Sequence, residues 1–433
     1  MIIAICLSLV SPQVHDTTAL TLAAARDRAL TANPTLRAGR AAARAAAAGP
    51  LEASGAFLPT LTADAQAMRS TDPVAVFGMK LRQSTFTAGD LGLDALNDPS
   101  PFTDYSARLG LELPLLNLAG WYGHAAAGRA AAAAAAGARR AAGATVLAVT
   151  RGYWDAGLAR GRVVALDTAL AAANAHAEQA DDLHRQGLVS GLDARLARLR
   201  VARLEAQRVA AAAEADNALA ALRALLALPD SAPLQLADSL TEAISDSVLP
   251  TTGGARGDLA AVEQGVHAAD FGVRAAWAAN LPSVAVFGNL AQHSHLGPLH
   301  SGSGDWTVGV GLVWRPFAGL SGLGAVRRAR AERDAAEARR EAATLQARLE
   351  VAQSERLHVA ALRRMAVSQD AQREALAALD QAKLRYRTGA ATISELLDVQ
   401  AALTDSELDL LAARHDVLVA AAFLDFANGV FDQ

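Results

Sequence analysis

Two stretches, RQGLVSGLD at residues 185–193 and RTGAATISE at residues 387–395, place the same turn at two points of the chain. In both, an arginine, a glycine, a hydroxyl side chain and a carboxylate follow one another in the same order. Pro114 lies 73 residues before Gly187, and Pro316 lies 73 residues before Gly389. Because two independent landmarks share one period, the sequence predicts two tandem copies of one structural plan.

A segment with almost no helix breakers separates each proline from its glycine. Residues 325–387, for example, are rich in Ala, Leu, Arg and Glu, which favour helices. Leu345, Leu349, Ala352 and Val359 recur at spacings of four, three and seven residues, as in a helix that packs along its whole length. We expect one helix of roughly 70 residues per copy, on the order of 100 Å long at about 1.5 Å per residue.

Each glycine suits the end of its long helix, because glycine adopts positive φ without strain. Ser190 and Thr392 follow as N-caps for a returning helix, with an acidic residue in its first turn. Each copy is therefore expected to contain a helical hairpin, with returning helices over residues 192–228 and 394–427. The tips of the two hairpins are expected near residues 187–191 and 389–393.

Ahead of each long helix the apolar pattern changes to a twofold alternation, which is typical of a strand. In residues 105–113, apolar side chains alternate with Ser, Arg, Gly and Glu. Residues 306–312 repeat the alternation, with Trp306 and Trp314 near the ends, where a membrane strand carries interfacial aromatics. Strands are expected near residues 60–69, 105–113, 283–293 and 305–314.

The composition excludes several classes of protein. With 433 residues, 52% of them hydrophobic, the chain can bury a large apolar surface and is not expected to be disordered. The 40 basic and 44 acidic residues give a formal net charge of -4, so nucleic acid is not an expected partner. No run of about 18 uncharged apolar residues occurs, so any membrane crossing would use β-structure.

The first residues resemble a damaged export signal, because residues 2–10 are apolar but lack the usual basic start. Cys6 is the only cysteine, which excludes an internal disulfide and a cysteine-based metal cluster. Ile5 is too bulky for a lipoprotein signal, so an unmodified leader cysteine is expected. The expected organisation is a signal segment at 1–16, a first repeat at 17–228, an inter-repeat linker or equatorial segment at 229–256 and a second repeat at 257–433.

Four strands per chain cannot close a membrane barrel, since about eight is the smallest number. An open sheet edge in lipid would leave backbone groups without hydrogen bonds. If the strands cross a membrane, several copies of the chain must therefore assemble. A small soluble sheet at the end of a coiled coil is the alternative for the same residues.

The stretches LRYRTG at 384–389, ISELLD at 393–398 and RQGLVS at 185–190, with Asp193, resemble the TolC-type outer-membrane efflux protein family, the outer membrane factors. The resemblance covers nearly the whole chain. It implies a mostly α fold with a β-barrel part. In that fold a homotrimer joins four strands per chain into a 12-stranded barrel in outer-membrane lipid, above an α-helical tunnel in the periplasm.

The same resemblance implies that the tips dock a periplasmic membrane-fusion adaptor, which links the channel to an inner-membrane pump. Glu395 and Asp398 fall where the family narrows the periplasmic entrance. Three copies of each would form acidic rings, which favour cations and couple the gate to pH. Glu395 is equally suited to completing the first turn of its helix. The implied docking residues are Gly187, Leu188, Val189, Ser190, Gly389, Ala390, Ala391 and Thr392.

Tyr386 and Asp193 fall where the family forms a hydrogen bond that latches adjacent coiled coils. A basic residue that helps this latch in some members is replaced here by Ala391. The resemblance therefore implies a looser gate in this chain.

Three histidines, His293, His295 and His300, lie in the expected turn of the second strand hairpin. Because only the distant Asp305 accompanies them, we interpret them as part of a surface loop and not as a metal site. No nucleophile, paired-carboxylate, phosphate-loop or zinc signature stands out, so no catalytic residue, cofactor or enzyme activity is expected. Residues 70–103 are expected to form a long loop outside the cell.

The sequence thus predicts an outer-membrane channel subunit of a tripartite efflux or type I secretion system, a passive conduit for substrates that the pump and adaptor deliver. The alternative is a periplasmic Ala-rich coiled-coil scaffold or adaptor without a channel. A helical lipid-binding protein is disfavoured because it does not explain the paired strand segments. The nature of the exported substrate leaves no sequence signature.

Overall fold

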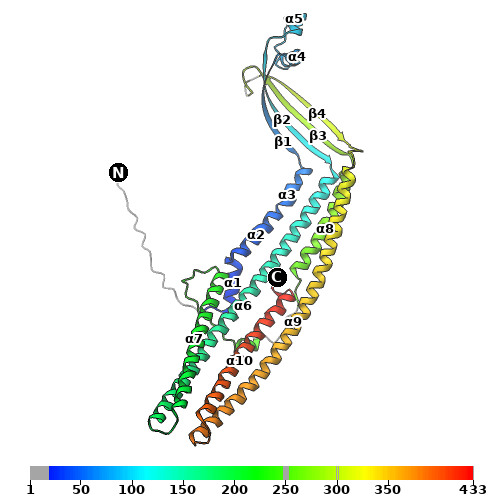
Figure 1. Ribbon diagram of the computed structural model, residues 1–433. Helices are drawn as coiled ribbons and strands as arrows, with labels where there is room; N and C mark the ends of the chain where they lie inside the picture. Colours follow the sequence, from blue (N-terminus) through cyan, green and yellow to red (C-terminus); the bar gives the residue numbers. More distant parts are fainter. Residues whose placement is uncertain (1–18, 247–252, 299, 301, 433) are drawn as a thin grey trace, which may run out of the picture. The chain divides into compact units, whose positions relative to one another are not determined.

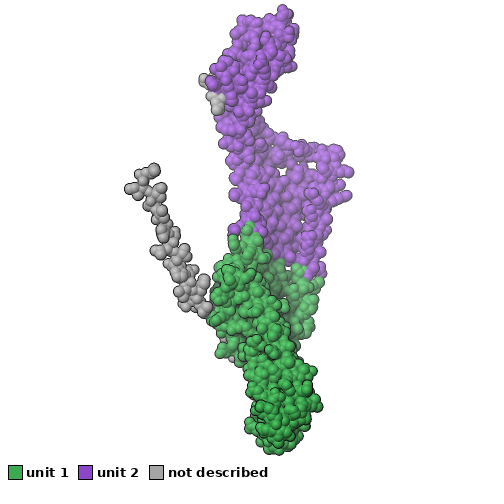
Figure 2. All heavy atoms as spheres, turned by 60° about the vertical axis from the view of Figure 1, so that its left-hand side comes forward, with its two compact units in different colours: residues 1–41, 136–260, 343–433 green, residues 42–135, 261–342 purple. Residues whose placement is uncertain are grey.

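The computed structural model describes residues 19–246, 253–298, 300 and 302–432. The signal segment expected at residues 1–16, with Cys6, lies outside these residues. The chain is mostly helical with one sheet, and it divides into two compact units (Figure 2). The helical unit comprises Met1–Ala41, Ala136–Ala260 and Ala343–Gln433, and the sheet unit comprises Ala42–Ala135 and Ala261–Ala342.

The sheet unit contains one antiparallel sheet, labelled in Figure 1, with the strand order β1-β2-β3-β4. Strands β1 and β4 are therefore its two edges. The central pair, β2 with β3, joins the first sequence copy to the second. Its register shifts between Pro114 and Leu116, where proline has no N–H to donate. The strands are β1 Thr60–Ser70, β2 Phe102–Leu116, β3 Ser283–Ser294 and β4 Ser303–Val313.

The segment between β1 and β2 is folded, although the sequence favoured a long loop there. Asp72 accepts a hydrogen bond from the Ala75 amide (2.7 Å) and so caps the first helix of the segment. The Lys80 ammonium lies 2.6 Å from the Asp90 carboxylate and ties this helix to the next turn. We call residues 71–101 the cap segment. Its helices are α4 Pro73–Arg82, η2 Ala88–Leu91 and α5 Leu93–Asn97.

Two very long helices follow the two strand hairpins, and each leads into a shorter returning helix. Helix α6, Leu118–Arg185, has 68 residues, and α9, Ser321–Arg387, has 67. Both contribute residues to both units. The returning helices, α7 (Gly191–Leu225) and α10 (Ile393–Ala427), have 35 residues each. Each pair forms a helical hairpin (Figure 1), and the matched lengths reflect the sequence repeat.

The remaining elements complete the two units. In the helical unit, Tyr153 and Trp154 of α6 pack with Leu222 and Leu226 in the largest buried cluster. Among the described residues, no helix is long and apolar enough to cross a membrane. The remaining elements are α1 Leu22–Ala32, α2 Pro34–Ala47, α3 Gly49–Ala53, η1 Ser54–Ala56, η3 Ala243–Asp246, α8 Gly257–Ala278 and η4 Val430–Asp432.

Candidate functional site

The two hairpin tips have the same backbone. Gly187 has a φ of +74° and Gly389 a φ of +72°, so both glycines adopt the left-handed conformation that ends a helix. The residue after each glycine donates its amide to a carbonyl five positions back: Leu188 to Leu183 (2.9 Å), and Ala390 to Arg385 (2.8 Å). A side chain at either glycine would strain these turns.

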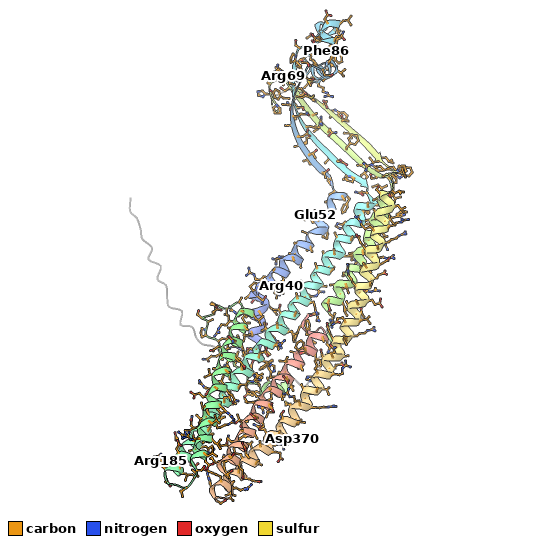
Figure 3. All side chains as sticks on the ribbon, in the orientation of Figure 1. Arg40, Glu52, Arg69, Phe86, Arg185 and Asp370 are labelled. Atoms are coloured by element: carbon orange, nitrogen blue, oxygen red, sulfur yellow. The ribbon has the colours of Figure 1, made fainter. Side chains whose placement is uncertain are left out.

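At the first tip, the side chains complete a capping box. The Asp193 amide donates to the Ser190 hydroxyl (3.2 Å), and the Asp193 carboxylate accepts from the Ser190 amide (3.1 Å) and hydroxyl (2.8 Å). The imidazole of His184 lies 3.2 Å from the Val189 carbonyl and braces the turn. Figure 3 labels Arg185 at this tip, where its guanidinium pairs with Asp182. The first tip is therefore closed by its own side chains.

At the second tip, only half of the box is present among the described hydrogen bonds. The Glu395 amide donates to the Thr392 hydroxyl (3.2 Å), but the Glu395 carboxylate lies 3.6 Å from the Arg385 guanidinium. That guanidinium also donates to the Ala390 carbonyl (3.1 Å). Glu395 does lie in the first helical turn, and its side chain is still about half exposed (53%).

The structure places Tyr386 and Asp193 in the same region without joining them. Tyr386 packs against the apolar cluster at which α6, α7, α9 and α10 meet. Its buried hydroxyl has no hydrogen-bond partner among the described residues. Burial raises the pKa of Tyr386, and the nearby negative charge of Asp193 adds to the effect. No hydrogen bond joins Tyr386 to Asp193 among the described residues, and Ser190 donates to one oxygen of the Asp193 carboxylate.

The other residues singled out at the tips are accessible. Asp398 is exposed on α10, one turn after Glu395. Leu188, at the first tip, exposes 68% of its surface, a high value for a leucine. Ala391 is half-buried. All eight docking residues are exposed or half-exposed: Gly187, Leu188, Val189, Ser190, Gly389, Ala390, Ala391 and Thr392.

The register of the sheet separates two faces of different chemistry. Ala63, Leu109, Leu290 and Trp306 are aligned across the four strands, and they lie on one face. The next row along the strands points to the opposite face. It contains Asp64, Arg108, Ala291 and Asp305. One face is therefore apolar and the other polar, and we use these two names below.

The apolar face is openly exposed along the edge strand β4. Trp306, Val308 and Val310 expose 73%, 67% and 70% of their surfaces, and Leu312 exposes 66%. Large contiguous apolar surfaces of this kind mark contact with a membrane or with another protein.

A cluster of charged side chains, which we call the clasp, fixes the C-terminal end of α10 in the helical unit; its arginines and Asp432 are largely buried, whereas Asp258 and Glu350 are about one third exposed. Arg256 pairs with Asp258 (2.6 Å) and Glu350 (2.8 Å), and it donates to the Ala427 carbonyl (3.0 Å). Arg140 donates to the Phe426 carbonyl (2.8 Å) and lies 3.3 Å from Asp432, whose side chain is fully buried. The guanidinium groups thus meet the carbonyl end of a helix dipole, where positive charge is favoured.

The pKa values of the clasp carboxylates show that the pairing outweighs burial. Burial, the largest single effect, acts to raise the pKa of both Asp258 and Glu350. Hydrogen bonds from Arg256, together with the positive charges of Arg256 and Arg140, nevertheless leave both pKa values below normal. The carboxylates therefore stay ionised inside the clasp.

The structure corrects our interpretation of His293. This residue is part of β3 and is almost fully buried (3% exposed), so it does not lie in a surface loop. Its Nδ1 lies 2.9 Å from Asp104, which is far away in the sequence, and its Nε2 lies 3.7 Å from Asp305. Across the described ranges, no group of three or more His, Cys, Asp or Glu side chains is placed to hold a metal ion.

Sequence reasoning missed both the clasp and the pairing of His293 with Asp104. Arg140, Arg256 and Asp432 come from three distant segments, so no local spacing links them. Glycines mark the close approach of these segments: a Cβ added at Gly143 would collide with the Asp432 carboxylate, and one added at Gly257 with the backbone of Arg140.

Comparisons with solved structures show the same fold. The outer-membrane channel OprN is 22% identical over 95% of this chain and 91% of its own, with a TM-score of 0.79. The outer membrane protein VceC from Vibrio cholerae is 19% identical over 94% of this chain and 96% of its own, with a TM-score of 0.78. The outer membrane channel CmeC from Campylobacter jejuni is 18% identical over 94% of this chain and 85% of its own, with a TM-score of 0.77.

A search of curated protein sequences gives no match. The family described as outer membrane efflux protein, in contrast, matches residues 25–228 and 254–430, one segment for each copy of the repeat. These segments contain all four strands, both helical hairpins and both tips. The chain therefore belongs to the outer membrane efflux protein family.

Proposed function

We propose that the chain is the outer-membrane channel subunit of a tripartite efflux or type I secretion system. Three copies would each supply four strands to one 12-stranded barrel, and their helices would enclose a tunnel in the periplasm. The channel is a passive conduit for substrates that an inner-membrane pump and a periplasmic adaptor deliver. Membership of the outer membrane efflux protein family supports this assignment.

The observation that carries the proposal is the sheet. It has one apolar and one polar face, and its two edge strands, β1 and β4, present backbone groups on their outer sides. In lipid such edges must be paired, because each unpaired backbone group costs several kcal/mol (roughly 2–7). Pairing β4 of one copy with β1 of the next satisfies both edges and places the polar face around a water-filled channel.

The tips support the remainder of the proposal. Their exposed residues would dock the adaptor, with Leu188 as an apolar contact (68% exposed). Glu395 and Asp398 would form acidic rings at the periplasmic entrance, where three like charges favour cations. In the closed channel Tyr386 would bond to Asp193 across adjacent coiled coils. Ala391 supplies no positive charge to this latch, so the closed state is expected to be weak.

Mass and location test the channel assignment first. The chain is expressed with a competent export signal, membranes are fractionated, and the detergent-solubilised particle is sized by light scattering. An outer-membrane particle of three times the chain mass of 44.6 kDa is expected. A detergent-independent monomer or dimer would contradict the channel and favour the coiled-coil scaffold.

Conductance in planar bilayers then tests the entrance. Replacing Glu395 with Gln and Asp398 with Asn should lower the preference for cations, because the ring charges disappear. The matched control is Asp405→Asn, an exposed acidic residue on the same helix but further from the tip. Equal selectivity in all variants would remove Glu395 and Asp398 from the entrance while leaving the channel assignment standing.

A further inference from the structure

The cap segment is attached to the sheet through one buried side chain. Gln83, at the end of α4, is 7% exposed, and its amide donates to the Asp104 carboxylate (2.7 Å) and the Thr103 carbonyl (3.0 Å) of β2. The next residue, Ser84, places its hydroxyl 2.8 Å from the hydroxyl of Ser303 on β4. The Gln83 amide also donates to the Ser294 carbonyl of β3 (3.4 Å), so the cap segment contacts three strands at the same end of the sheet.

This attachment continues across the polar face. The second oxygen of Asp104 lies 2.9 Å from His293 of β3, which in turn lies 3.7 Å from Asp305 of β4. Asp104 and His293 are 4% and 3% exposed, so the contacts are shielded from water. Hydrogen bonds that are shielded from water are electrostatically stronger than exposed ones. The cap segment is thus tied to the side of the sheet that would face the channel.

Contacts within the cap segment join α4 to the residues that follow it. Phe77 of α4 meets Phe86 edge to face, with ring centroids 4.9 Å apart, and Figure 3 labels Phe86 at this end of the sheet. The ion pair of Lys80 with Asp90 joins the same two parts (2.6 Å). Ser84 has a φ of +56°, which is rare and strained for a residue with a side chain. This strained backbone turn at Ser84 directly follows Gln83, the residue that attaches the cap segment to the sheet.

The exposed surface of the cap segment carries several large apolar side chains beside polar ones such as Asp72, Arg82 and Asp94. Val74, Leu81, Leu91 and Leu93 expose 81%, 50%, 62% and 77% of their surfaces. An external loop would normally present polar side chains to water. Apolar constrictions, in contrast, close channels by excluding water from the narrow part.

We propose that the cap segment is a gate at the outer mouth of the channel, held in place by Gln83 on Asp104. This inference rests on the proposed function, because it needs the polar face to line a channel. The strand ends that lead into the helices would face the periplasm, so the cap segment, at the opposite ends, faces outside. Three copies around one axis would bring these exposed apolar side chains together and close the mouth. Release of Gln83 from Asp104 would let the three cap segments separate and open it.

Access to the polar face from outside the cell tests the gate. A thiol reporter is introduced as Asn289→Cys, since Asn289 lies on the polar face between Gly110 and Thr307. Cys6 is replaced by Ser in every variant. Intact cells are treated with a bulky, membrane-impermeant maleimide, and labelling at position 289 is followed by peptide mass spectrometry. This readout does not depend on the state of the periplasmic tips.

Gln83→Leu should raise the labelling rate roughly tenfold, because the hydrogen bonds to the Asp104 carboxylate and the Thr103 carbonyl are lost. The matched control is Gln292→Leu: Gln292 lies near the same end of the sheet and donates its amide to the His300 carbonyl (2.6 Å), away from the cap segment. Its labelling rate should equal that of the parent. The double variant Ser84→Cys with Ser303→Cys should form a disulfide that lowers the rate below the parent, and a reductant should reverse this.

A second reporter distinguishes failure of the gate from failure of the proposed channel function. Val310→Cys lies on the apolar face, which faces lipid if the proposed function is right, and should not be labelled. If position 310 is protected but the Gln83→Leu and disulfide variants label position 289 at the parent rate, the gate is wrong and the channel stands. If position 310 is labelled as fast as position 289, the membrane placement of the sheet is wrong and the gate falls with it.

Discussion

The two ends of helix α10 are held in different ways. At its C-terminal end, Arg256 and Arg140 donate to the Ala427 and Phe426 carbonyls, inside a set of partly buried ion pairs. At its N-terminal end, Thr392 makes a single capping bond and the charged side chains are exposed. The C-terminal end of the helix is thus held by ion pairs and by hydrogen bonds to its last carbonyls. The N-terminal end is held by one cap and by Ile393 and Leu396, which are buried in an apolar cluster (3% and 1% exposed).

This difference indicates where the helical unit can move. Desolvated ion pairs with satisfied hydrogen bonds are costly to break from one side, whereas exposed caps contribute about 1 kcal/mol. A hairpin fixed at the clasp, with exposed caps and charges beyond the apolar cluster at its other end, can rearrange its tip residues without unfolding. The periplasmic gate proposed above needs that combination. Breaking the clasp and weakening the tips should therefore have effects of different size and kind.

Removing the central cation of the clasp should have the largest effect. Arg256→Met leaves Asp258 and Glu350 short of their partner in a site where the Arg256 side chain is only 7% exposed. Asp258 and Glu350 are each about one third exposed (35% and 34%), and Arg140 remains 3.6 Å and 3.8 Å from them. We therefore expect a loss of about 2–3 kcal/mol in unfolding free energy, less than one-sided removal from a fully buried pair. Thermal unfolding of the purified channel, monitored by circular dichroism, would measure it.

The matched control for Arg256→Met removes an arginine from an exposed pair. Arg364 lies 2.7 Å from Asp416, and both side chains are well exposed (54% and 39%). Arg364→Met should cost less than about 1 kcal/mol, because water screens such pairs. If both variants unfold at the same temperature, the clasp is not the anchor that its geometry indicates.

Much of the fold could be predicted because local signals agree with the tertiary structure. The twofold alternation in residues 105–113 marks the middle of β2, and the positive-φ glycines and hydroxyl caps at both tips mark the helix ends. These features depend on residues within a few positions of one another. The cap segment was predicted wrongly. Its prolines and glycines indicated a loop, but the ion pair between Lys80 and Asp90 holds a helical turn in place.

The functional contacts were less predictable, because they join distant residues or compete for one group. His293 looked like a loop residue because its partner Asp104 lies in the other sequence copy. Asp193 was assigned by resemblance to a latch with Tyr386, which stays a prediction; within the chain its carboxylate also accepts a hydrogen bond from Ser190, three residues away.

Removing the caps should have an intermediate effect that differs between the two tips. Ser190→Ala abolishes the capping box and should weaken the first turn of α7 by about 1–2 kcal/mol. Thr392→Ala removes a single bond and should weaken α10 by about half as much, roughly 0.5–1 kcal/mol. Hydrogen exchange of the amides in both first turns measures this directly.

The control for the caps is Ser406→Ala, which removes a hydroxyl that donates to the Leu403 carbonyl in the middle of α10. It should leave exchange at both tips unchanged. Equal protection losses for Ser190→Ala and Thr392→Ala would show that the carboxylate of Asp193 adds nothing to its tip, and the contrast between the tips would disappear.

The smallest effect, and the one that most sharpens the comparison, concerns a single hydroxyl. Tyr386 buries an Oη with no hydrogen-bond partner among the described residues. Tyr153, in the same unit, donates its Oη to the Leu20 carbonyl (2.8 Å) and also lies 3.0 Å from Asp238. Tyr153→Phe should therefore cost about 1–2 kcal/mol. Tyr386→Phe should cost less than about 0.5 kcal/mol or stabilise slightly, because a desolvated hydroxyl is removed.

Conductance measurements on Tyr386→Phe test whether this hydroxyl also acts in the periplasmic gate. If Tyr386 bonds to Asp193 in the closed channel, Tyr386→Phe should raise the open probability while hardly changing the unfolding temperature, since the bond is absent from the single chain. Tyr153→Phe should do the reverse. A Tyr386→Phe channel that is destabilised like Tyr153→Phe would mean that the hydroxyl has a structural partner in the assembled protein. A Tyr386→Phe channel unchanged in both measurements would remove Tyr386 from the gate and leave Glu395 and Asp398 as its candidates.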